Sequence, residues 1–194
     1  MSNPTELTGC RGGCKANETT CHILQACPIA HEIRVERHNS VASRIAAHCK
    51  KKGWTTFEEL HIRHQDGTLF KHDIVAFTSP DTAVVCDAQV SWETSEPIPE
   101  VWDRKRGVYD NEKFREAALQ KWPDVNLSFL PCILGDRGIW PACNAATAES
   151  LQLRSVDTQP LPWGFVLSAR RDPGKVCLFI YFFSKFNAHF ELRN

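Results

Sequence analysis

Three cysteines and one histidine near the start of the chain, Cys10, Cys14, His22 and Cys27, constrain its folding more than any other feature. Three residues separate the first two, seven separate Cys14 from His22, and four separate His22 from Cys27. This spacing is typical of one tetrahedral zinc ion held by three thiolates and one imidazole. So short a segment cannot bury a core, so it folds around the metal or stays unfolded. Small zinc modules of this kind usually bind nucleic acid. Cys21 remains open as a competing ligand.

The other cysteines favour a reducing compartment over a disulfide-stabilised protein. The chain has 194 residues, nine of them cysteine and 42% hydrophobic, which suits one compact domain plus a small appended module. An odd cysteine count with ligand-like spacing argues for metal binding. Five cysteines lie in apolar stretches and are expected to be small buried side chains: Cys49, Cys86, Cys132, Cys143 and Cys177.

Charge and hydropathy argue against three classes of protein. The 23 basic and 23 acidic residues cancel, which excludes a uniformly basic protein but leaves room for a local basic patch. The N-terminus is polar, without the apolar run of a secretory signal. The most apolar stretch, residues 176–183, is far shorter than the roughly 20 residues of a membrane-spanning helix. We therefore expect an intracellular protein that does not enter a membrane.

Hydrophobic periodicity predicts alternating helices and strands after the cysteine-rich segment. Residues 32–52 carry apolar side chains at steps of three and four, as expected of a helix, which Gly53 ends. The lysines at its end, residues 50–52, form either a solvated cap or a phosphate contact. We expect strands over residues 54–62, 69–77, 83–92 and 125–134, and an irregular segment over 93–108. Two further helices are expected, one over residues 110–122 capped by Asp110 and one from Pro141 to about Leu153. Asp172-Pro173-Gly174 favours a hairpin near the C-terminus, with a helix as the alternative.

Two aspartates inside strand-like apolar runs are the strongest candidates for catalysis. Asp73 precedes Ile74 and Asp87 follows Cys86, at positions where carboxylates are rare without a reason. If the runs form an antiparallel hairpin with its tip at Pro80, paired residue numbers sum to 160 and the aspartates face each other. Their Cβ atoms would lie about 5 Å apart on one face. The alternative is another register, with each carboxylate capping or bonding locally.

A divalent cation between these carboxylates would reverse their mutual repulsion. Mg²⁺ commonly takes one or two protein carboxylates and fills its shell with water and phosphate oxygens. Such an ion can promote attack on a phosphodiester. Other side chains could also contribute to this site. Gln89 and Lys71 lie on the same strand face as the aspartates, because they are two residues away from them. Glu58 or Glu59 could supply a third carboxylate, and Lys113 on the following helix could supply a cation or stay solvated.

Several stretches carry a resemblance to a known family. They are residues 18–28 (ETTCHILQACP), with His31, Arg34 and Arg37-His38-Asn39 after them, then residues 71–76 (KHDIVA), 85–90 (VCDAQV) and 137–141 (RGIWP). In this order they resemble the C-terminal region of site-specific non-LTR retrotransposon polyproteins, which insert into ribosomal RNA genes. In that family, a CCHC zinc knuckle and an endonuclease of the PD-(D/E)XK type follow the reverse transcriptase.

The resemblance implies an α/β, restriction-endonuclease-like mixed sheet flanked by helices and preceded by a small zinc knuckle. It implies structural zinc on the four residues named at the outset, and catalytic magnesium on Asp73 and Asp87. Lys113 is the closest match to the family's downstream lysine, and Gln89 completes the expected catalytic set by strand periodicity. The expected parts are a disordered tail over residues 1–9, the knuckle over 10–30, the endonuclease domain over 31–155, and an extension over 156–194 that matches the family poorly.

The implied activity is a nick in target DNA, whose free end primes reverse transcription. DNA is the implied partner, the element's RNA is a further candidate, and the nucleus is the implied compartment. The chain departs from the family at His72, where the family has proline. It also departs after Lys113: the family's aromatic residue stands a few positions beyond its lysine, whereas here Phe114 follows Lys113 directly. No reverse transcriptase precedes the knuckle, so we expect the nick alone. A zinc-dependent nucleic-acid-binding fragment without catalysis is the alternative, and a cellular zinc protein with an incidental aspartate pair is a third hypothesis.

Overall fold

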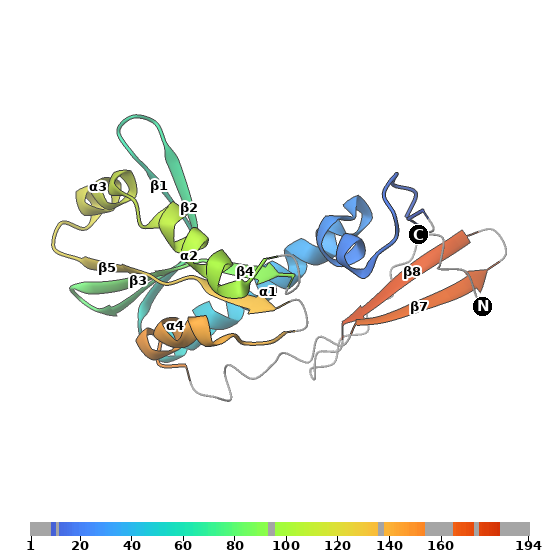
Figure 1. The fold of residues 1–194 in the computed structure, drawn as a ribbon. Helices are drawn as coiled ribbons and strands as arrows, with labels where there is room; N and C mark the ends of the chain where they lie inside the picture. The colour runs from blue at the N-terminus through green and yellow to red at the C-terminus, as the bar shows by residue number, and fades with distance from the viewer. Residues whose placement is uncertain are drawn as a thin grey trace.

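A four-stranded mixed sheet forms the centre of the fold (Figure 1). Three antiparallel strands follow one another along the chain, namely β1 (Thr55–Arg63), β2 (Leu69–Ser79) and β3 (Thr82–Cys86). The fourth strand, β5 (Asn126–Phe129), lies parallel to β3. Two short strands directly after β3 and β5 pair parallel with each other: β4 (Ala88–Ser91) and β6 (Cys132–Gly135). This arrangement confirms the predicted α/β class with a mixed sheet.

The computed structural model describes residues 9–10, 12–92, 96–135, 138–153, 165–172 and 175–182, the last two ranges as backbone. Residues 1–8 of the predicted tail, Arg137 and most of the predicted C-terminal extension lie outside these ranges. Within the described ranges, no helix has the length and apolar character needed to cross a membrane.

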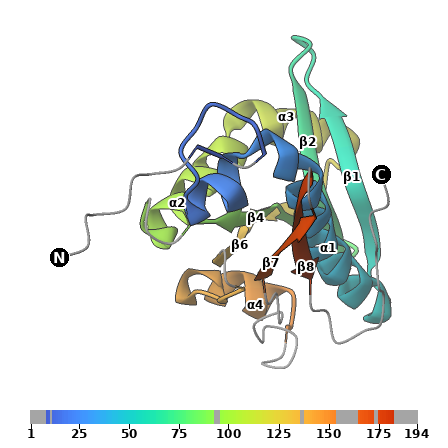
Figure 2. The same cartoon turned by 90° about the vertical axis from the view of Figure 1, so that its right-hand side faces the viewer.

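Helices cover both faces of the sheet (Figure 2). On one face lies α1 (His31–Lys51), close to the predicted range. The opposite face carries α2 (Ile98–Tyr109) and α3 (Glu112–Lys121). Short helical turns complete the fold: η1 (His22–Ala26) and η2 (Pro28–Ala30) before α1, and η3 (Ala142–Asn144) with α4 (Ala145–Ser150) after β6.

The alternation of side chains along the strands divides the core into two layers. On the α1 side, Ile74 and Ala76 of β2 pack with Val84 and Cys86 of β3 against apolar residues of α1. On the α3 side, the intervening residues, including Val75 and others of β3 and β5, pack against Phe114, Ala117 and Ala118. Burial of both faces explains why these strands read as continuous apolar runs.

The alternation of β2 reverses at Asp73. Ile74 faces α1, so strict period two would also turn His72 toward α1 and Asp73 away from it. Instead, the His72 ring contacts Tyr109 and Phe114 on the other face, and Asp73 bonds His38 of α1. The neighbouring strand β1 is disturbed at the same level, because Glu59 has a φ of 49° and is left out of the pairing. This local reversal brings the Asp73 carboxylate toward α1.

Two predicted strands are each divided in the structure. The strand predicted over residues 83–92 splits into β3 and β4 at Asp87, and the one over 125–134 splits into β5 and β6 at Leu130 and Pro131. Backbone bonds bridge the division, since the Leu130 amide donates to the Val85 carbonyl and the Cys132 amide to the Asp87 carbonyl. The break therefore leaves Asp87 between two strand segments, outside the regular pairing of either.

The prediction of an irregular segment over residues 93–108 is wrong, because α2 occupies most of it. Pro97 and Pro99 were interpreted as breakers, but they lie at the cap and the first turn of α2, where proline is well tolerated. Val101 and Trp102 then anchor this helix on Ile133. The cap of α3 also differs from the prediction: the Asn111 side chain, not Asp110, accepts the Phe114 amide at 2.9 Å.

Polar side chains secure the ends and one edge of the sheet. Asn144 is fully buried, accepts the Ile133 amide at 3.0 Å and donates to the Ile133 carbonyl at 2.6 Å. At the end of α1, the Lys50 ammonium pairs with Glu58, and Lys52 donates to the Gln152 side chain at 3.1 Å. Lys50 and Lys52 of the lysine run therefore join the end of α1 to side chains of neighbouring segments.

The C-terminal part of the described chain is a hairpin. β7 (Phe165–Asp172) and β8 (Lys175–Phe182) pair antiparallel from Phe165↔Phe182 to Asp172↔Lys175. This pairing confirms the hairpin interpretation over the helical one. The Asp-Pro-Gly sequence is a turn signal, and it lies between two strands of eight residues each.

His64 joins the turn between β1 and β2 to α3. Its Nδ1 lies 2.8 Å from Oδ1 of Asp66, and its Nε2 lies 3.1 Å from Oε2 of Glu116. Hydrogen bonds to Asp66 and then to Glu116 raise the pKa of His64 above its ordinary value. The charged imidazole therefore stabilises the folded protein more than the neutral one.

We predict that replacing His64 with Gln destabilises the protein more in acid than in alkali. A histidine whose folded pKa exceeds the unfolded value of about 6.5 stabilises fully below that pH, and the effect is lost as pH rises through the folded pKa. Urea denaturation of wild type and His64→Gln at pH 5.5 and 9 measures the difference in unfolding free energy. An equal difference at both pH values would contradict this role for the imidazolium.

Candidate functional site

The four predicted zinc ligands lie together beside the N-terminal end of α1. One ligand atom from each of Cys10, Cys14, His22 and Cys27 falls within 4.8 Å of every other. The Sγ atoms of Cys10 and Cys27 are 3.7 Å apart, and Sγ of Cys14 is 3.0 Å from Nε2 of His22. Tetrahedral zinc with Zn–S bonds of about 2.3 Å places two sulfurs about 3.8 Å apart. The donor set and its spacing therefore fit zinc, and Cys21 does not belong to this group.

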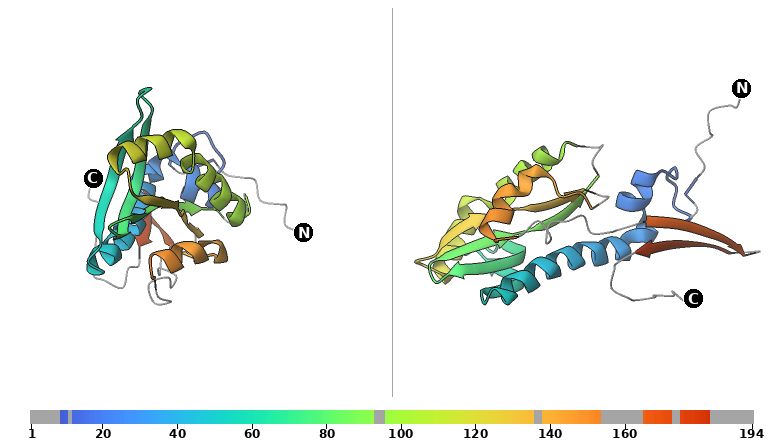
Figure 3. Two further views of the ribbon diagram at one scale, coloured as in Figure 1. Left: turned by 90° about the vertical axis from the view of Figure 1, so that its left-hand side faces the viewer. Right: turned by 90° about the horizontal axis from the view of Figure 1, so that it is seen from below.

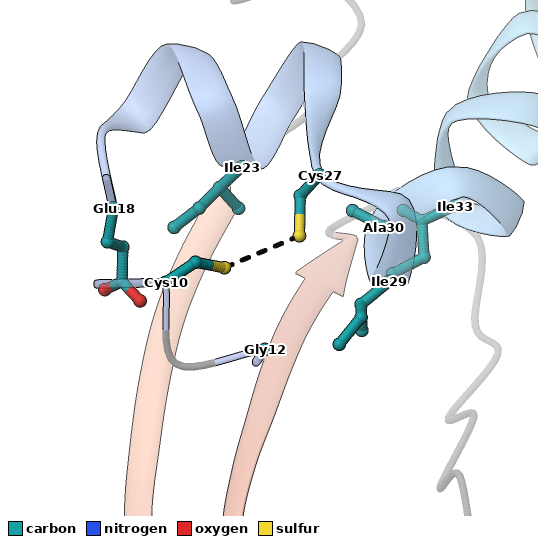
Figure 4. A pocket seen from close by; sticks show the side chains of 8 residues that line it. All are labelled: Cys10, Gly12, Glu18, Ile23, Cys27, Ile29, Ala30 and Ile33. Carbon is teal, nitrogen blue, oxygen red and sulfur yellow. Dashed lines mark hydrogen bonds between the residues drawn. The ribbon is translucent and has the colours of Figure 1, made fainter. Parts of the chain in front are cut away.

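Local structure presents these ligands from two short segments. The loop with Cys10 and Cys14 turns at Gly13, whose φ of 78° favours glycine. The next segment is one turn of π-helix, η1, with His22 at its start and Cys27 directly after it. Figure 4 shows the Cys10 and Cys27 thiols pointing toward each other, with Ile23, Ile29 and Ala30 around them. This small apolar shell is separate from both layers of the main core.

The knuckle, residues 10–30, is bonded directly to α1. The Arg34 guanidinium donates to the Cys27 carbonyl at 2.6 Å, and that of Arg37 donates to the Leu24 carbonyl at 3.3 Å. Arg37 is buried, which is rare for arginine without a partner. The first turns of α1 are therefore held by the backbone of the zinc-binding segment.

Asp73 and Asp87 meet at the end of the β2–β3 pairing. The register runs from Phe77↔Ala83 to Ile74↔Cys86, so paired numbers sum to 160 as predicted, with an irregularity near the turn. Beyond Ile74, side chains continue the pairing: the Asp73 amide donates to Oδ1 of Asp87 at 3.4 Å, and the Ala88 amide donates to Oδ2 of Asp73 at 2.7 Å. The sequence thus predicted the meeting of the two strands correctly at this point.

The two carboxylates are held by different helices, where the sequence predicted one common face. Oδ1 of Asp73 lies 3.2 Å from Nε2 of His38 on α1. Oδ2 of Asp87 pairs with the Lys105 ammonium on α2, and the Tyr109 hydroxyl also bonds this carboxylate. They still form one group, because each carboxylate accepts an amide from the other's segment: Asp87 from Asp73, and Asp73 from Ala88. We call His38, Asp73, Asp87, Lys105 and Tyr109 the charged cluster.

The pKa values of the two aspartates move in opposite directions. Burial raises the pKa of Asp87, and the nearby charge of Asp73 adds to this, while Lys105 acts against it. Burial also acts to raise the pKa of Asp73, but the bonds from His38 and Ala88 outweigh it and lower the net value. The hydrogen bond to Asp73 in turn raises the pKa of His38. Asp73 is therefore the more readily ionised carboxylate of the pair.

The structure places the other predicted site residues in different surroundings. Gln89 lies half-buried on β4 opposite Ile133 of β6, two residues beyond Asp87. Lys71 is exposed on β2. The Lys113 ammonium lies 2.7 Å from Oδ2 of Asp66, in the turn between β1 and β2. Lys113 thus belongs to the hairpin turn, and the cation beside Asp87 is Lys105.

Sequence reasoning missed Lys105 and Tyr109 because it assigned their segment no regular structure. The two residues are four apart on α2, so they lie one helical turn above each other. The Lys105 ammonium lies 5.5 Å from the centre of the Tyr109 ring, and the lysine side chain is 18% exposed. A lysine followed four residues later by an aromatic residue, on a helix opened by proline, was the available signal.

His72, which replaces the family's proline, is buried against the charged cluster. It is 1% exposed, and neither ring nitrogen has a hydrogen-bond partner. Its ring centre lies 4.9 Å from that of Tyr109 and 4.3 Å from that of Phe114. Burial lowers the pKa of His72 to about 4, so the ring is neutral at pH 7 and supports Tyr109 by packing.

We predict that the purified protein holds one zinc per chain, and that Cys14→Ser releases it. Loss of one thiolate weakens a four-ligand site strongly, and the knuckle has little core of its own to retain its shape. Cys21→Ser is the matched control, because Cys21 is next to His22 but outside the ligand group. Metal analysis after gel filtration measures the zinc content. Equal zinc loss in the two variants would contradict the assignment of ligands.

Comparison with known proteins identifies relatives over most of the chain. Three proteins of Popillia japonica, each a retrovirus-related Pol polyprotein from type-1 retrotransposable element R2, are 51%, 47% and 45% identical over 150, 148 and 150 residues. These matches cover 77%, 76% and 77% of this chain but 21%, 24% and 34% of the relatives. No family model matches the chain. The chain belongs to the Pol polyproteins of R2 retrotransposable elements and corresponds to one segment of them.

Proposed function

We propose that this chain is a metal-dependent DNA endonuclease of the restriction-like PD-(D/E)XK type. Its role would be to nick target DNA so that the exposed end primes reverse transcription. The relatives support a retroelement role, since they are named Pol polyproteins of retrotransposable elements. The mixed sheet with helices on both faces is compatible with the proposed fold.

The observation that carries the proposal is the charged cluster. Two carboxylates from neighbouring strands are held close together, with a lysine ammonium against one of them. Like charges so placed need compensation, and a divalent cation compensates them most effectively. Oxygen ligands from two aspartates suit Mg²⁺, which usually takes one or two protein carboxylates. The donor set at Asp73 and Asp87 therefore fits magnesium.

Four residues of the charged cluster, and Gln89 near it, have a role in this chemistry. Asp73 and Asp87 would hold the cation, which when bound stabilises negative charge on the phosphate. Lys105 is tethered to Asp87 and partly exposed, so its ammonium can turn toward the phosphate oxygens of a DNA strand. Tyr109 holds Asp87 and lies beside Lys105, which orients both. Gln89, near Asp87 on β4, is placed to orient a water.

The knuckle would add nucleic-acid binding to this catalytic unit. Small zinc modules recognise nucleic acid in many proteins, and zinc here would be structural. DNA is the proposed partner, the element's RNA is a second one, and the nucleus is the proposed site of action, because insertion into ribosomal RNA genes requires access to chromosomal DNA.

A second candidate function is nucleic-acid binding without catalysis. The knuckle supports it, because its ligand group is formed independently of the charged cluster. The ion pair of Lys105 with Asp87 also lets the cluster satisfy its charges without a cation. In that case the protein would bind DNA or RNA but leave a plasmid intact.

We predict that the protein converts supercoiled plasmid to the open circle in Mg²⁺. Asp73→Asn and Asp87→Asn should abolish the activity, because a neutral amide lacks the negative charge with which a carboxylate attracts Mg²⁺. Lys105→Ala should slow it about a hundredfold, as expected when one charge-stabilising donor is removed. Initial rates on agarose gels measure the effect.

Lys113→Ala is the matched control, since this lysine is also paired with an aspartate but in the β1–β2 turn. It should nick at the wild-type rate. Nicking that survives Asp73→Asn would refute the endonuclease proposal. Binding of DNA by a wild-type protein that shows no nicking in Mg²⁺ would favour the second function.

A further inference from the structure

The knuckle and the charged cluster are bonded to the same helix. α1 begins at His31, after the short turn η2 that follows the last zinc ligand, Cys27. In Figure 3, α1 runs from the sheet to the knuckle as one continuous helix. A helix transmits a displacement of one end along its length because its backbone bonds are continuous. The two sites therefore have a direct physical connection.

Consecutive residues of α1 reach the two sites. Arg34 and Arg37 donate to carbonyls of the knuckle, at Cys27 and Leu24. His38 follows Arg37 in the chain and lies one turn after Arg34, on the same side of the helix. Its Nε2 bonds Oδ1 of Asp73. The segment that touches the knuckle is thus the segment that touches the carboxylate.

The C-terminal part of α1 is anchored differently. Its buried apolar residues, Val41, Ile45, Ala46 and Cys49, belong to the core layer that contacts β2 and β3. Of the residues before Val41, Arg37 is buried, and it is bonded to the knuckle. The first two turns therefore depend on the knuckle for their position, while the rest of the helix depends on the sheet.

His38 restricts the Asp73 carboxylate. One oxygen accepts from His38 and the other from the Ala88 amide, so the plane of the carboxylate is fixed from both ends. Without His38, one bond remains and the carboxylate can rotate about it. Partners that hydrogen-bond a metal ligand typically change metal affinity by about 10–100-fold when they are removed.

We propose that His38 is a positioning residue that orients Asp73 for the catalytic cation, and that the zinc knuckle controls this orientation through the first turns of α1. The proposal rests on the proposed function, because it assumes that Asp73 binds a divalent cation. Zinc then has a consequence beyond the knuckle: losing it loosens the first turns of α1, and the cation site at Asp73 and Asp87 weakens.

Direct binding of Mn²⁺ tests the proposal without relying on activity. The free Mn²⁺ signal in electron paramagnetic resonance gives the dissociation constant for zinc-loaded protein. His38→Ala should weaken binding about tenfold, while His38→Gln should restore most of the affinity, because the glutamine amide can donate to Asp73 in place of the imidazole. His31→Ala, at an exposed position in the first turn of the same helix, is the matched control and should bind as wild type does.

The role of the knuckle is tested by measuring Mn²⁺ binding in Cys14→Ser and in the double variant that also carries His38→Ala. If the knuckle acts through His38, Cys14→Ser weakens Mn²⁺ binding, and the double variant binds no more weakly than His38→Ala alone. Losses that multiply in the double variant would overturn the coupling. Wild-type affinity in folded His38→Ala would overturn the positioning role whatever Cys14→Ser does.

Asp73→Asn separates this inference from the proposed function. Unchanged Mn²⁺ binding in Asp73→Asn would defeat the proposed function itself. Binding that is lost in Asp73→Asn but unchanged in His38→Ala would defeat only the inference. Far-ultraviolet circular dichroism of each variant confirms that the sheet core is intact.

Discussion

The mutual repulsion of Asp73 and Asp87 sets the conditions that the surrounding structure has to meet. Two carboxylates at neighbouring strand positions are costly in a half-buried setting. The chain compensates them with side chains from both helical layers, the His38 imidazole from α1 and the Lys105 ammonium from α2. Backbone amides of Asp73 and Ala88 and the Tyr109 hydroxyl supply further bonds. Both helices are consequently fixed to the sheet at the same place, where β3 gives way to β4.

The parts of the fold with a regular apolar pattern could be predicted from the sequence. The helix before Gly53 and the hairpin register, with pairs such as Val75↔Val85, follow from periodicity and turn residues. The segment that became α2 could not be predicted in this way, because its prolines suggested irregular structure and its helix is fixed by tertiary contact of Trp102 and Val101 with Ile133. The reversal at Asp73 is equally non-local, since it coincides with the unusual backbone of Glu59 on the adjacent strand.

The same contrast holds for the candidate site. The zinc ligands are close in sequence, so their spacing was sufficient to predict the group. The lysine of the charged cluster comes from a separate helix, α2, and choosing among several downstream lysines required knowing which helix faces Asp87. The importance of His38 had the same origin, because its contact with Asp73 spans 35 residues of the chain. Local spacing predicts local sites, whereas clusters built across layers require coordinates.

The side chains and the backbone at two strand edges affect how readily this protein can self-associate. An uncovered edge strand offers unpaired backbone groups to which a second chain can add as a new strand, the first step of aggregation. Along β6, the Asn144 side chain already occupies both backbone groups of Ile133. On the outer strand β1, the backbone is kinked at Glu59, and charged side chains such as Arg63 follow it. Neither β6 nor β1 therefore offers a long, flat template to which a second chain could add as a new strand.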